Sequence, residues 1–294
     1  MLNKVVIVGV GLIGAAFALA LKRGNGARTV IGIDRDAATL AQALACGAID
    51  RQGSMADAND ADLVVLAVPV RQMGNALLAL RPFIAAHTLI IDVGSTKQDV
   101  CAAARAALDV CAGQFVPCHP IAGGERHGPL AASAEMFVGK NVVMTPLAEN
   151  FASNIQAVAD IWRQLGAHVI IMTAAAHDAV FAAVSHLPHM LAFALVDELA
   201  SRPNARVFFE HAASGFRDFT RIASSSPEMW RDVALNNRDA LLTELDAFLA
   251  RAARLRQSLA EANDAELFAM MQRAQQARAQ WLTGQFEHFR DDAA

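Results

Sequence analysis

The chain has 294 residues, of which 54% are hydrophobic and 18% are charged, and its formal net charge is −4. This length predicts two domains, and the acidic balance argues against nucleic acid and against an anionic membrane surface as partners. The four cysteines show no C-x-x-C spacing, so reduced thiols in a cytoplasmic protein are expected.

The chain begins with an apolar strand that leads directly into a glycine-rich turn. Residues 5–14 read V-V-I-V-G-V-G-L-I-G, and a helix is expected to continue over residues 15–21. In a G-x-G-x-x-G turn the first glycine permits the tight bend, the second lets a pyrophosphate approach the backbone, and the third lets helix and strand pack closely. The positive end of the helix then faces the phosphates. The candidate phosphate-binding residues are Gly9, Gly11, Leu12, Ile13 and Gly14.

A signal peptide is the alternative interpretation of this segment, because residues 5–21 carry no charge and lie between Lys4 and the pair Lys22 and Arg23. The segment is short for a membrane span, which needs about 20 apolar residues. A signal sequence also gives no reason for three glycines at this spacing. The dinucleotide interpretation is therefore favoured.

An acidic residue after the second strand supports the same interpretation. This strand is expected over residues 29–33 and is followed by Asp34, where a carboxylate can bind the ribose hydroxyls. Such a carboxylate would repel a 2′-phosphate, so NAD is expected as the cofactor. The neighbouring Arg35 could receive that phosphate, which leaves NADP open.

The rest of the first half alternates apolar strands with helices. The further strands are expected over residues 62–68, 88–93, 114–118, 141–145 and 168–172. This alternation predicts a mostly parallel sheet that is covered by helices on both faces. Ligands in such sheets bind beyond the carboxyl ends of the strands. The candidate residues at these ends are Val68, Pro69, Gly94, Ser95 and His119.

From Thr173 onwards the pattern is helical. Thr173 is expected to cap a helix, and Asn263 to start the last one. Between them an apolar stripe over residues 241–259 predicts a long helix that packs against a partner. No segment in this half is expected to span a bilayer. The predicted domains are 1–172, which binds the dinucleotide, and 173–294, which is all-α.

Three clusters outside the glycine-rich turn combine polar side chains with glycine or proline. Their sequences are H-P-I-A-G-G-E over residues 119–125, S-H-L-P-H over 185–189, and G-F-R-D-F-T-R-I-A over 215–223, with P-x-M-W further on. Ser185 and His189 share one helix face. Pro188 lacks the N–H that a straight helix needs, so a kink is expected there.

These segments, in this order, resemble the signature segments of the prephenate and arogenate dehydrogenase family of tyrosine biosynthesis, and the resemblance covers essentially the whole chain. It implies a Rossmann-type domain followed by a helical dimerisation domain, and hence a homodimer. It also implies NAD-dependent oxidation of a cyclohexadienol, with release of CO2 as the ring becomes aromatic. Prephenate would give 4-hydroxyphenylpyruvate and arogenate would give tyrosine, and the sequence does not distinguish the two.

The resemblance also implies roles for individual residues. His119 matches the family's catalytic histidine, which accepts the proton of the substrate hydroxyl, and its imidazole is expected to titrate near neutral pH. Ser95 matches the serine beside it near the nicotinamide, and Arg221 matches the arginine that binds a substrate carboxylate. Four residues match family positions that line or gate the pocket, namely Ser185, His189, Glu125 and Trp230. The tryptophan could act in the pocket of its own subunit or in that of the partner. Ser214 stands where some relatives have glycine, which puts the pocket rim in doubt.

Structural roles remain open for several of these residues. Ser185 and His189 could satisfy backbone groups at the proline kink, and Arg221 could lie on a solvated face. Glu125 could be an ion-pair partner, and His177 has no assigned role. A metal site is not expected, because no third ligand accompanies the two histidines of S-H-L-P-H.

Two other functions share parts of this plan. A β-hydroxyacid or 6-phosphogluconate-type dehydrogenase would use a lysine on the first interdomain helix, but residues 173–210 contain no lysine. A non-catalytic NAD-binding regulator would keep the glycine-rich turn but would not need His119 together with Arg221. The expected function is therefore the dehydrogenase, in which NAD accepts the hydride and the protein supplies position and one base.

Overall fold

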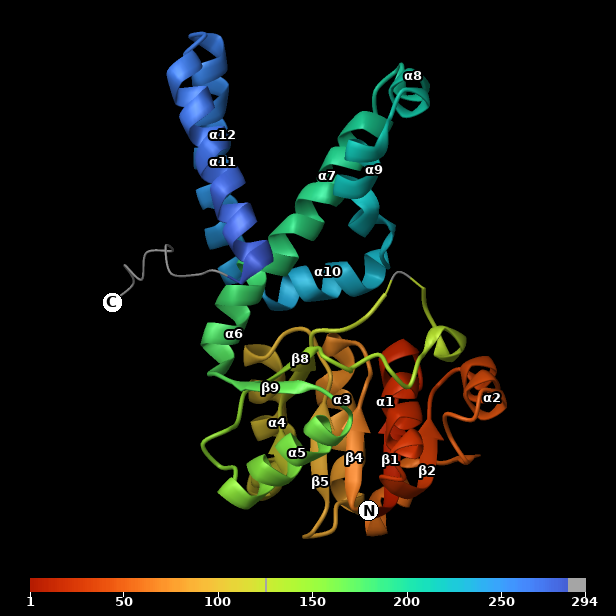
Figure 1. Ribbon diagram of the computed structural model, residues 1–294. Helices are drawn as coiled ribbons and strands as arrows, with labels where there is room; N and C mark the ends of the chain where they lie inside the picture. Colours follow the sequence, from red (N-terminus) through yellow and green to blue (C-terminus); the bar gives the residue numbers. More distant parts are fainter. Residues whose placement is uncertain (125, 285–294) are drawn as a thin grey trace. The chain divides into compact units, whose positions relative to one another are not determined.

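The computed structural model describes residues 1–124 and 126–284 (Figure 1). The candidate Glu125 and the tail after Gly284, which the sequence predicts to fray, lie outside these residues. The chain forms two compact units, residues 1–241 and residues 242–294. The first unit contains all the strands and helices α1 to α10.

A six-stranded parallel sheet forms the centre of the first unit, with the strand order β3-β2-β1-β4-β5-β6. Its strands are β1 (Leu2–Val8), β2 (Ala27–Ile33), β3 (Arg51–Gln52), β4 (Leu63–Leu66), β5 (Leu89–Asp92) and β6 (Phe115–Val116). Val8 of β1 pairs with Leu66 of β4, and Leu66 pairs with Asp92 of β5. These three strands therefore end at one level, and the loops that follow them share one edge of the sheet. The predicted parallel sheet is confirmed.

Helices cover both faces of this sheet (Figure 1). One apolar cluster contains α1 (Leu12–Arg23), α2 (Ala37–Ala45) and α5 (Ala152–Gln164), and the other contains α3 (Met73–Leu80) and α4 (Gln98–Leu108). Alternate residues of β1 enter the two clusters, because side chains alternate across a strand. In the first cluster Phe17 meets Trp162 edge to face, with 5.0 Å between ring centroids. Burial of each ring contributes roughly 3 kcal/mol.

A second, three-stranded sheet has the order β7-β8-β9. Its strands are β7 (Cys118–Pro120), β8 (Asn141–Met144) and β9 (His168–Ile171). The single strand predicted over residues 114–118 divides at Pro117, because proline has no N–H with which to continue the ladder to β5. β7 instead pairs antiparallel with β8, and His119 lies opposite Val143. His119 is thus inside β7, just beyond the end of β6, rather than at the end of one strand as predicted.

Helices complete the first unit after β9. They are α6 (Ala174–Phe181), α7 (Leu187–Ala200), α8 (Ala205–Glu210), α9 (Ser214–Thr220) and α10 (Pro227–Asn236). Thr173 caps α6 as predicted, since its Oγ1 accepts from the Ala176 N–H at 3.1 Å. A π-helical turn, Ala182–His186, joins α6 to α7. It stands directly before Pro188, where the missing N–H interrupts the regular helix ladder as the sequence predicts.

The helical run Ala174–Ala200 is long and apolar enough to cross a membrane, with a mean hydropathy of 1.8, contrary to the expectation from the sequence. The sequence predicts a kink at Pro188, and the π-helical turn before it keeps the helical run continuous. Length and composition alone are weak evidence for a span, and His177 and Asp178 in this run are buried and hydrogen-bonded to β7 and α4.

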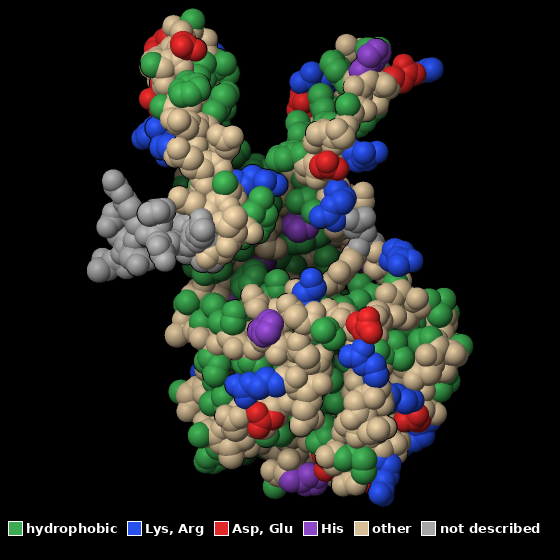
Figure 2. Space-filling model, in the orientation of Figure 1, with side chains coloured by type: hydrophobic (Ala, Val, Ile, Leu, Met, Phe, Trp, Pro, Cys, Tyr) green, Lys and Arg blue, Asp and Glu red, His purple; other side chains and the backbone are tan. Residues whose placement is uncertain are grey.

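Much of this run is nevertheless uncovered. Only 28% of its apolar window is buried, and Val184 is 66% exposed. In Figure 2 apolar side chains are visible along the arm that contains α7 and α9, and charged ones gather towards its tip. Phe209 and Phe219 on the neighbouring helices are also exposed. Exposed apolar residues that stand singly are common on protein surfaces, whereas a group of them indicates a face that contacts another protein or a membrane.

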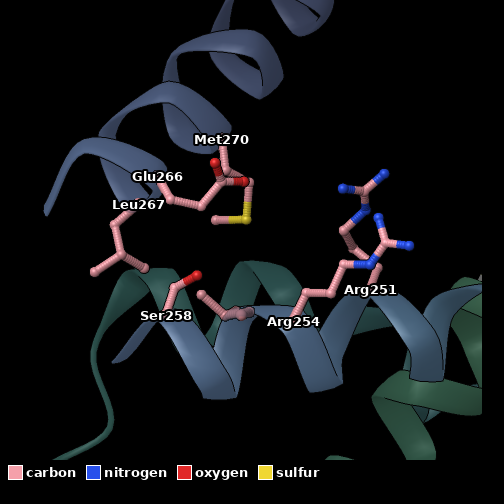
Figure 3. Close-up of a pocket in the computed structure, with 7 residues that line it drawn as sticks. Arg251, Arg254, Ser258, Glu266, Leu267 and Met270 are labelled. Carbon is pink, nitrogen blue, oxygen red and sulfur yellow. The ribbon is translucent and has the colours of Figure 1, made fainter. Parts of the chain in front are cut away.

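Helix α11 (Arg238–Ala260) begins in the first unit, and the described part of the second unit consists of the rest of α11 and of α12 (Asp264–Thr283). Asn263 caps α12 as expected, since its Oδ1 accepts from the Glu266 N–H at 3.1 Å. A cleft lies between Ser258 on the first helix and Met270 on the second (Figure 3), and its volume is about 10 Å³. This volume is no larger than one water molecule, so the cleft is not a substrate site.

Candidate active site

The glycine-rich turn joins β1 to α1, and each of its glycines meets a different steric demand. Gly9 has a φ of +92°, and a Cβ there would lie 2.6 Å from the carbonyl oxygen of Ala67. A Cβ on Gly14 would lie 2.1 Å from the carbonyl oxygen of Gly9, so only glycine lets α1 approach the turn. A Cβ on Gly11 would meet nothing within 4 Å. Gly11 therefore borders open space, where a pyrophosphate can approach the backbone.

The start of α1 faces the same space. Leu12 and Ile13 open this helix and are partly buried. Among the described residues, none caps the helix end with its side chain, and the first turn contains no acidic residue. The positive end of the helix dipole is thus left for an anion, so the turn and the helix together fit the pyrophosphate of a dinucleotide.

Asp34 lies beside the turn, directly after β2. Its Oδ2 accepts a hydrogen bond from the Val10 N–H and its Oδ1 accepts one from the Asp36 N–H, each at 3.0 Å. These bonds hold the carboxylate against the glycine-rich turn, and the neighbouring Arg35 is exposed. The position fits the ribose contact that the sequence predicts.

The loops after β4 and β5 lie at the same edge of the sheet. Val68 and Pro69 follow β4, and Gly94 and Ser95 follow β5. The Gly94 N–H donates to the Asp92 Oδ2 at 2.8 Å, which fixes the turn after β5. Ser95 and Val68 are partly buried. The predicted cofactor residues are therefore gathered along one edge.

A buried ion pair holds the strand that carries His119. Lys97 and Asp92 are both fully buried, and the Lys97 Nζ donates to the Asp92 Oδ2 and, at 2.7 Å, to the carbonyl oxygen of Cys118. The Asp92 Oδ1 accepts from the Cys118 N–H at 2.9 Å. Loss of one partner would leave an uncompensated buried charge, which typically costs about 3–5 kcal/mol. The pair thus places β7 next to the end of β5.

His119 is one end of a row of three polar side chains. Its Nδ1 lies 2.8 Å from the His177 Nε2, and the His177 Nδ1 lies 2.8 Å from the Asp178 Oδ1. Asp178 also accepts the N–H groups of Lys97 at 2.9 Å and Gln98 at 2.8 Å. His177 and Asp178 are buried on α6. The row therefore connects α6 to β7 and to the start of α4.

The surroundings keep these histidines neutral. Burial lowers the pKa of His119 well below its ordinary value of 6.5, and the charge of Lys97, together with His177 and His186 when they are protonated, lowers it further. The pKa of His177 is also lowered, chiefly by burial, although the hydrogen bond to Asp178 opposes the shift. The expectation that His119 titrates near neutral pH is therefore wrong. Its imidazole stays able to accept a proton at pH values well below 6.5.

Asn237 connects this row to a second group of side chains. Its Nδ2 donates to the carbonyl oxygen of Asp178 at 2.8 Å and lies 3.0 Å from the His186 Nδ1. His186 meets Trp230 with ring centroids 6.0 Å apart, and Trp230 stacks on His189 at 3.5 Å. Within the described residues, the His186 Nε2 and the Trp230 Nε1 are buried without a hydrogen-bond partner. Trp230 thus contacts the histidines of its own chain.

His189 and Arg221 form the outer part of this group. The His189 Nδ1 donates to the carbonyl oxygen of Ser185 at 2.8 Å, which leaves the lone pair on Nε2. This bond gives the Ser185 carbonyl in the π-helical turn a hydrogen-bond partner. Such a backbone contact is the alternative, structural role of His189 that the sequence leaves open. Burial lowers the pKa of His189, the bond to Ser185 opposes this, and the charge of Arg221 lowers the pKa again. Arg221 is exposed and close enough to act on His189.

The structure therefore brings together most of the predicted substrate residues, in one connected region beside the sheet edge. Sequence reasoning missed His177 and Asp178, although a signal was present. They are the two polar residues of the otherwise apolar helix Ala174–Phe181. A histidine and an aspartate inside an apolar helix must be paired when buried, and such pairs concentrate at functional sites.

A hollow of about 560 Å³ on the first unit lies elsewhere. It is lined mainly by apolar residues, among them Leu147, Ile155 and Met172. None of the predicted site residues lines it. The candidate site is therefore identified by the connected side chains from His119 to Arg221, and not by this hollow.

Comparison with known proteins identifies both halves of the chain. The family described as "Prephenate dehydrogenase, nucleotide-binding domain" matches residues 17–171, and "Prephenate dehydrogenase, dimerization domain" matches residues 173–273. The cyclohexadienyl dehydrogenase of Zymomonas mobilis is 36% identical over 280 residues, which are 94% of this chain and 95% of that relative.

Two solved structures agree with these matches. Prephenate dehydrogenase from A. aeolicus, in complex with hydroxyphenyl propionate and NAD+, has a TM-score of 0.89 and 32% identity over 95% of this chain and 98% of that one. Synechocystis arogenate dehydrogenase has a TM-score of 0.80 and 28% identity over 95% of this chain and 99% of that one. The chain therefore belongs to the prephenate dehydrogenase family, as its signature segments predict.

Proposed function

We propose that the protein catalyses the NAD-dependent oxidative decarboxylation of prephenate to 4-hydroxyphenylpyruvate and CO2, with arogenate, which would give tyrosine, as the second candidate substrate. The observation that carries the proposal is the position of His119. A hydrogen bond from the neighbouring Cys118 holds its strand next to the end of β5. The strand β1, which leads into the glycine-rich turn, ends at the same level as β5. Family membership supports it, as do the NAD+ and hydroxyphenyl propionate bound to the A. aeolicus relative.

In this reaction His119 takes one proton from the substrate hydroxyl and later returns it to the product. NAD, when bound, accepts the hydride from the ring carbon that bears the hydroxyl. As the hydroxyl becomes a carbonyl, its proton moves to the neutral imidazole of His119. The bond between ring and carboxylate then breaks, CO2 leaves, and the electron pair of that bond completes the aromatic ring. The phenolate oxygen takes the proton back from His119, which ends the cycle neutral.

Other residues hold the dienol in place. Arg221 is proposed to bind a substrate carboxylate, because a guanidinium pairs with a carboxylate through two parallel hydrogen bonds. Ser95, after β5, is proposed to lie beside the nicotinamide and the reacting hydroxyl. The wall of the pocket is proposed to be formed by Ser185, His189, Glu125 and Trp230. The stacking of Trp230 on His189 supports this assignment.

Direct turnover tests the proposal. The purified protein is mixed with NAD and, in parallel, with prephenate or arogenate, while NADH absorbance and the aromatic product are followed. NADH formed together with an equal amount of 4-hydroxyphenylpyruvate supports the first candidate, and NADH formed with tyrosine supports the second. The names of the Zymomonas and Synechocystis relatives justify the arogenate arm. Absence of NADH in both arms would overturn the proposed function.

Asp34 should give the enzyme a preference for NAD over NADP. A carboxylate held at the ribose repels a 2′-phosphate, and such a like-charge contact costs several kcal/mol, which corresponds to well over tenfold in kcat/KM. Asp34→Asn removes the charge and keeps an acceptor oxygen, so it should raise kcat/KM with NADP, aided by Arg35. Steady-state kinetics with both cofactors measure this. Equal kcat/KM values for NAD and NADP in the unaltered enzyme would contradict the assignment.

We further propose that the protein is a homodimer built through its helical half. The match to a dimerization domain supports this, and so does the exposed apolar surface of α7. On the predicted stripe of α11, Phe248 is 41% and Leu259 is 61% exposed. Stable dimers bury surfaces of this apolar kind.

Light scattering at micromolar concentration should therefore give twice the 31.3 kDa mass of the chain. Val184→Glu, on the exposed face of the π-helical turn, should weaken the dimer, because it places a charge in an apolar contact. Val110→Glu changes an exposed valine of the first half and is the matched control. A fully active monomer would contradict the proposal.

The functional division is proposed to fall between Met172 and Thr173. Residues 1–172 would bind the cofactor, and residues 173–294 would supply the dimer contact and the substrate wall. A cytoplasmic location is proposed from the four unpaired cysteines, which suit a reducing compartment. Neither a nucleic acid nor a membrane is proposed as a partner.

A further inference from the structure

His177 is buried between the proposed base and a carboxylate. Its Nε2 lies 2.8 Å from the His119 Nδ1, and its Nδ1 lies 2.8 Å from the Asp178 Oδ1. Phe181 packs against both imidazoles, with ring centroids 4.9 Å from His119 and 4.5 Å from His177. Both rings are therefore held by packing as well as by hydrogen bonds.

The partners of Asp178 determine where the protons of this row lie. Its two oxygens accept the N–H groups of Lys97 and Gln98 at the start of α4. Burial favours the neutral acid, but the hydrogen bonds from His177 and from these two amides outweigh it, so the pKa of Asp178 is lowered. Asp178 is thus an ionised acceptor, and the His177 Nδ1 must carry the proton of their shared bond.

The same reasoning extends to the next ring. A neutral His177 with its proton on Nδ1 has a lone pair on Nε2, so this nitrogen can only accept. The bond between the two histidines then requires the proton of neutral His119 to lie on Nδ1. The remaining lone pair of His119 is on Nε2, the nitrogen that faces away from His177.

We propose that His177 is a positioning residue, which fixes His119 in the tautomer whose Nε2 is free to accept the substrate proton, and which links the protonated His119 to the carboxylate of Asp178 through two hydrogen bonds. The inference rests on the proposed function, since it assumes that His119 is the base. It adds a residue to which that function assigns no role.

The charges around His119 show why such support matters. Burial, a protonated His177, Lys97 and a protonated His186 all disfavour an imidazolium there, so His177 can support it only while His177 itself is neutral. The carboxylate of Asp92 is already paired with Lys97. Asp178 is linked to His119 through one imidazole. When His119 accepts a proton, its positive charge is therefore connected through His177 to the carboxylate of Asp178. Catalytic bases are commonly oriented by a hydrogen-bonded neighbour in this way.

Two variants of similar size separate hydrogen bonding from packing. His177→Gln places an amide oxygen at roughly the reach of Nε2, where it can accept the His119 Nδ1 proton. His177→Leu fills the space without an acceptor. We expect kcat to fall by about 10- to 100-fold in the leucine variant, the usual effect of removing a second-layer orienting partner, and much less in the glutamine variant. KM for NAD should change little in both.

The tautomer is measured independently of turnover, by NMR of the protein labelled with ¹⁵N-histidine in the absence of substrate. The signals of His119 are those that disappear in His119→Asn. In the unaltered protein and in His177→Gln, its Nδ1 should be protonated at neutral pH and its Nε2 should not. In His177→Leu this fixed tautomer should be lost.

Several results would overturn the inference. They are an Nε2-protonated His119 in the unaltered protein, a leucine variant with normal kcat, and a glutamine variant as slow as the leucine one. If the leucine variant does not fold, the tautomer of the unaltered protein decides. Failure of the unaltered protein to oxidise either dienol would overturn the proposed function and the catalytic role of His177 with it, whereas the tautomer, which is measured without substrate, tests the hydrogen bond between the two histidines separately.

Discussion

His119→Asn should lower kcat by about 10²- to 10⁴-fold, the range that a positioned general base contributes. Asparagine has no basic nitrogen, so the substrate hydroxyl would have no acceptor for its proton as hydride leaves the ring. Binding of the dienol should change much less, because its carboxylates are held elsewhere. Steady-state kcat and KM at saturating NAD measure both effects.

A matched control uses another histidine of the same domain. His87 lies exposed just before β5, and His87→Asn should leave kcat unchanged. If His119→Asn retained near-normal kcat, the base would lie elsewhere. His189 is then the next candidate, because its Nε2 carries a lone pair and the ring faces Trp230.

The pH dependence of kcat gives a second measure of the same residue. A protonated imidazole cannot accept a proton, so activity is lost as the pH falls through the pKa of His119. Since burial keeps that pKa well below 6.5, the acidic limb should lie well below pH 6.5 and not at it. His119→Asn should remove this limb. A limb that persists in the variant would assign it to another group.

The sequence predicts the central sheet and the glycine-rich turn because their signals are local. The first two apolar strands, the three spaced glycines and the acid after the second strand lie within 34 residues, and each later strand is a short apolar run of its own. The structure supplies a steric reason for Gly9 and Gly14 within that same segment. The cap at Thr173 and the break before Pro188 are likewise set by adjacent residues. Local chemistry thus accounts for most of the fold.

Long-range contacts explain what the sequence does not predict. β7 leaves the main sheet at Pro117, and its new place depends on the buried pair of Asp92 and Lys97. The contact between His119 and His177 joins residues that are 58 positions apart. Neither the spacing nor the composition of the chain indicates such a contact, or the burial that is the main cause of the lowered pKa of His119.

Arg221→Ala should raise KM for the dienol by well over tenfold. A hydrogen bond to a charged group contributes about 1.5–3 kcal/mol, and 1.4 kcal/mol corresponds to a factor of ten. The side chain is exposed, so its loss should leave the fold intact, and the affinity for NAD should stay nearly unchanged. Initial rates over a range of dienol concentrations, with a separate NAD titration, measure both quantities.

Two further variants show whether the guanidinium itself is required. Arg221→Lys keeps the positive charge but loses the paired donors, so KM should recover only in part. Arg206→Ala removes an exposed arginine of α8, which pairs with Glu210 at 2.5 Å, and should leave KM unchanged. A normal KM in Arg221→Ala would make this arginine a surface residue. An equal rise in Arg206→Ala would instead attribute the effect to the overall charge of the helical half, because both variants remove one positive charge from it.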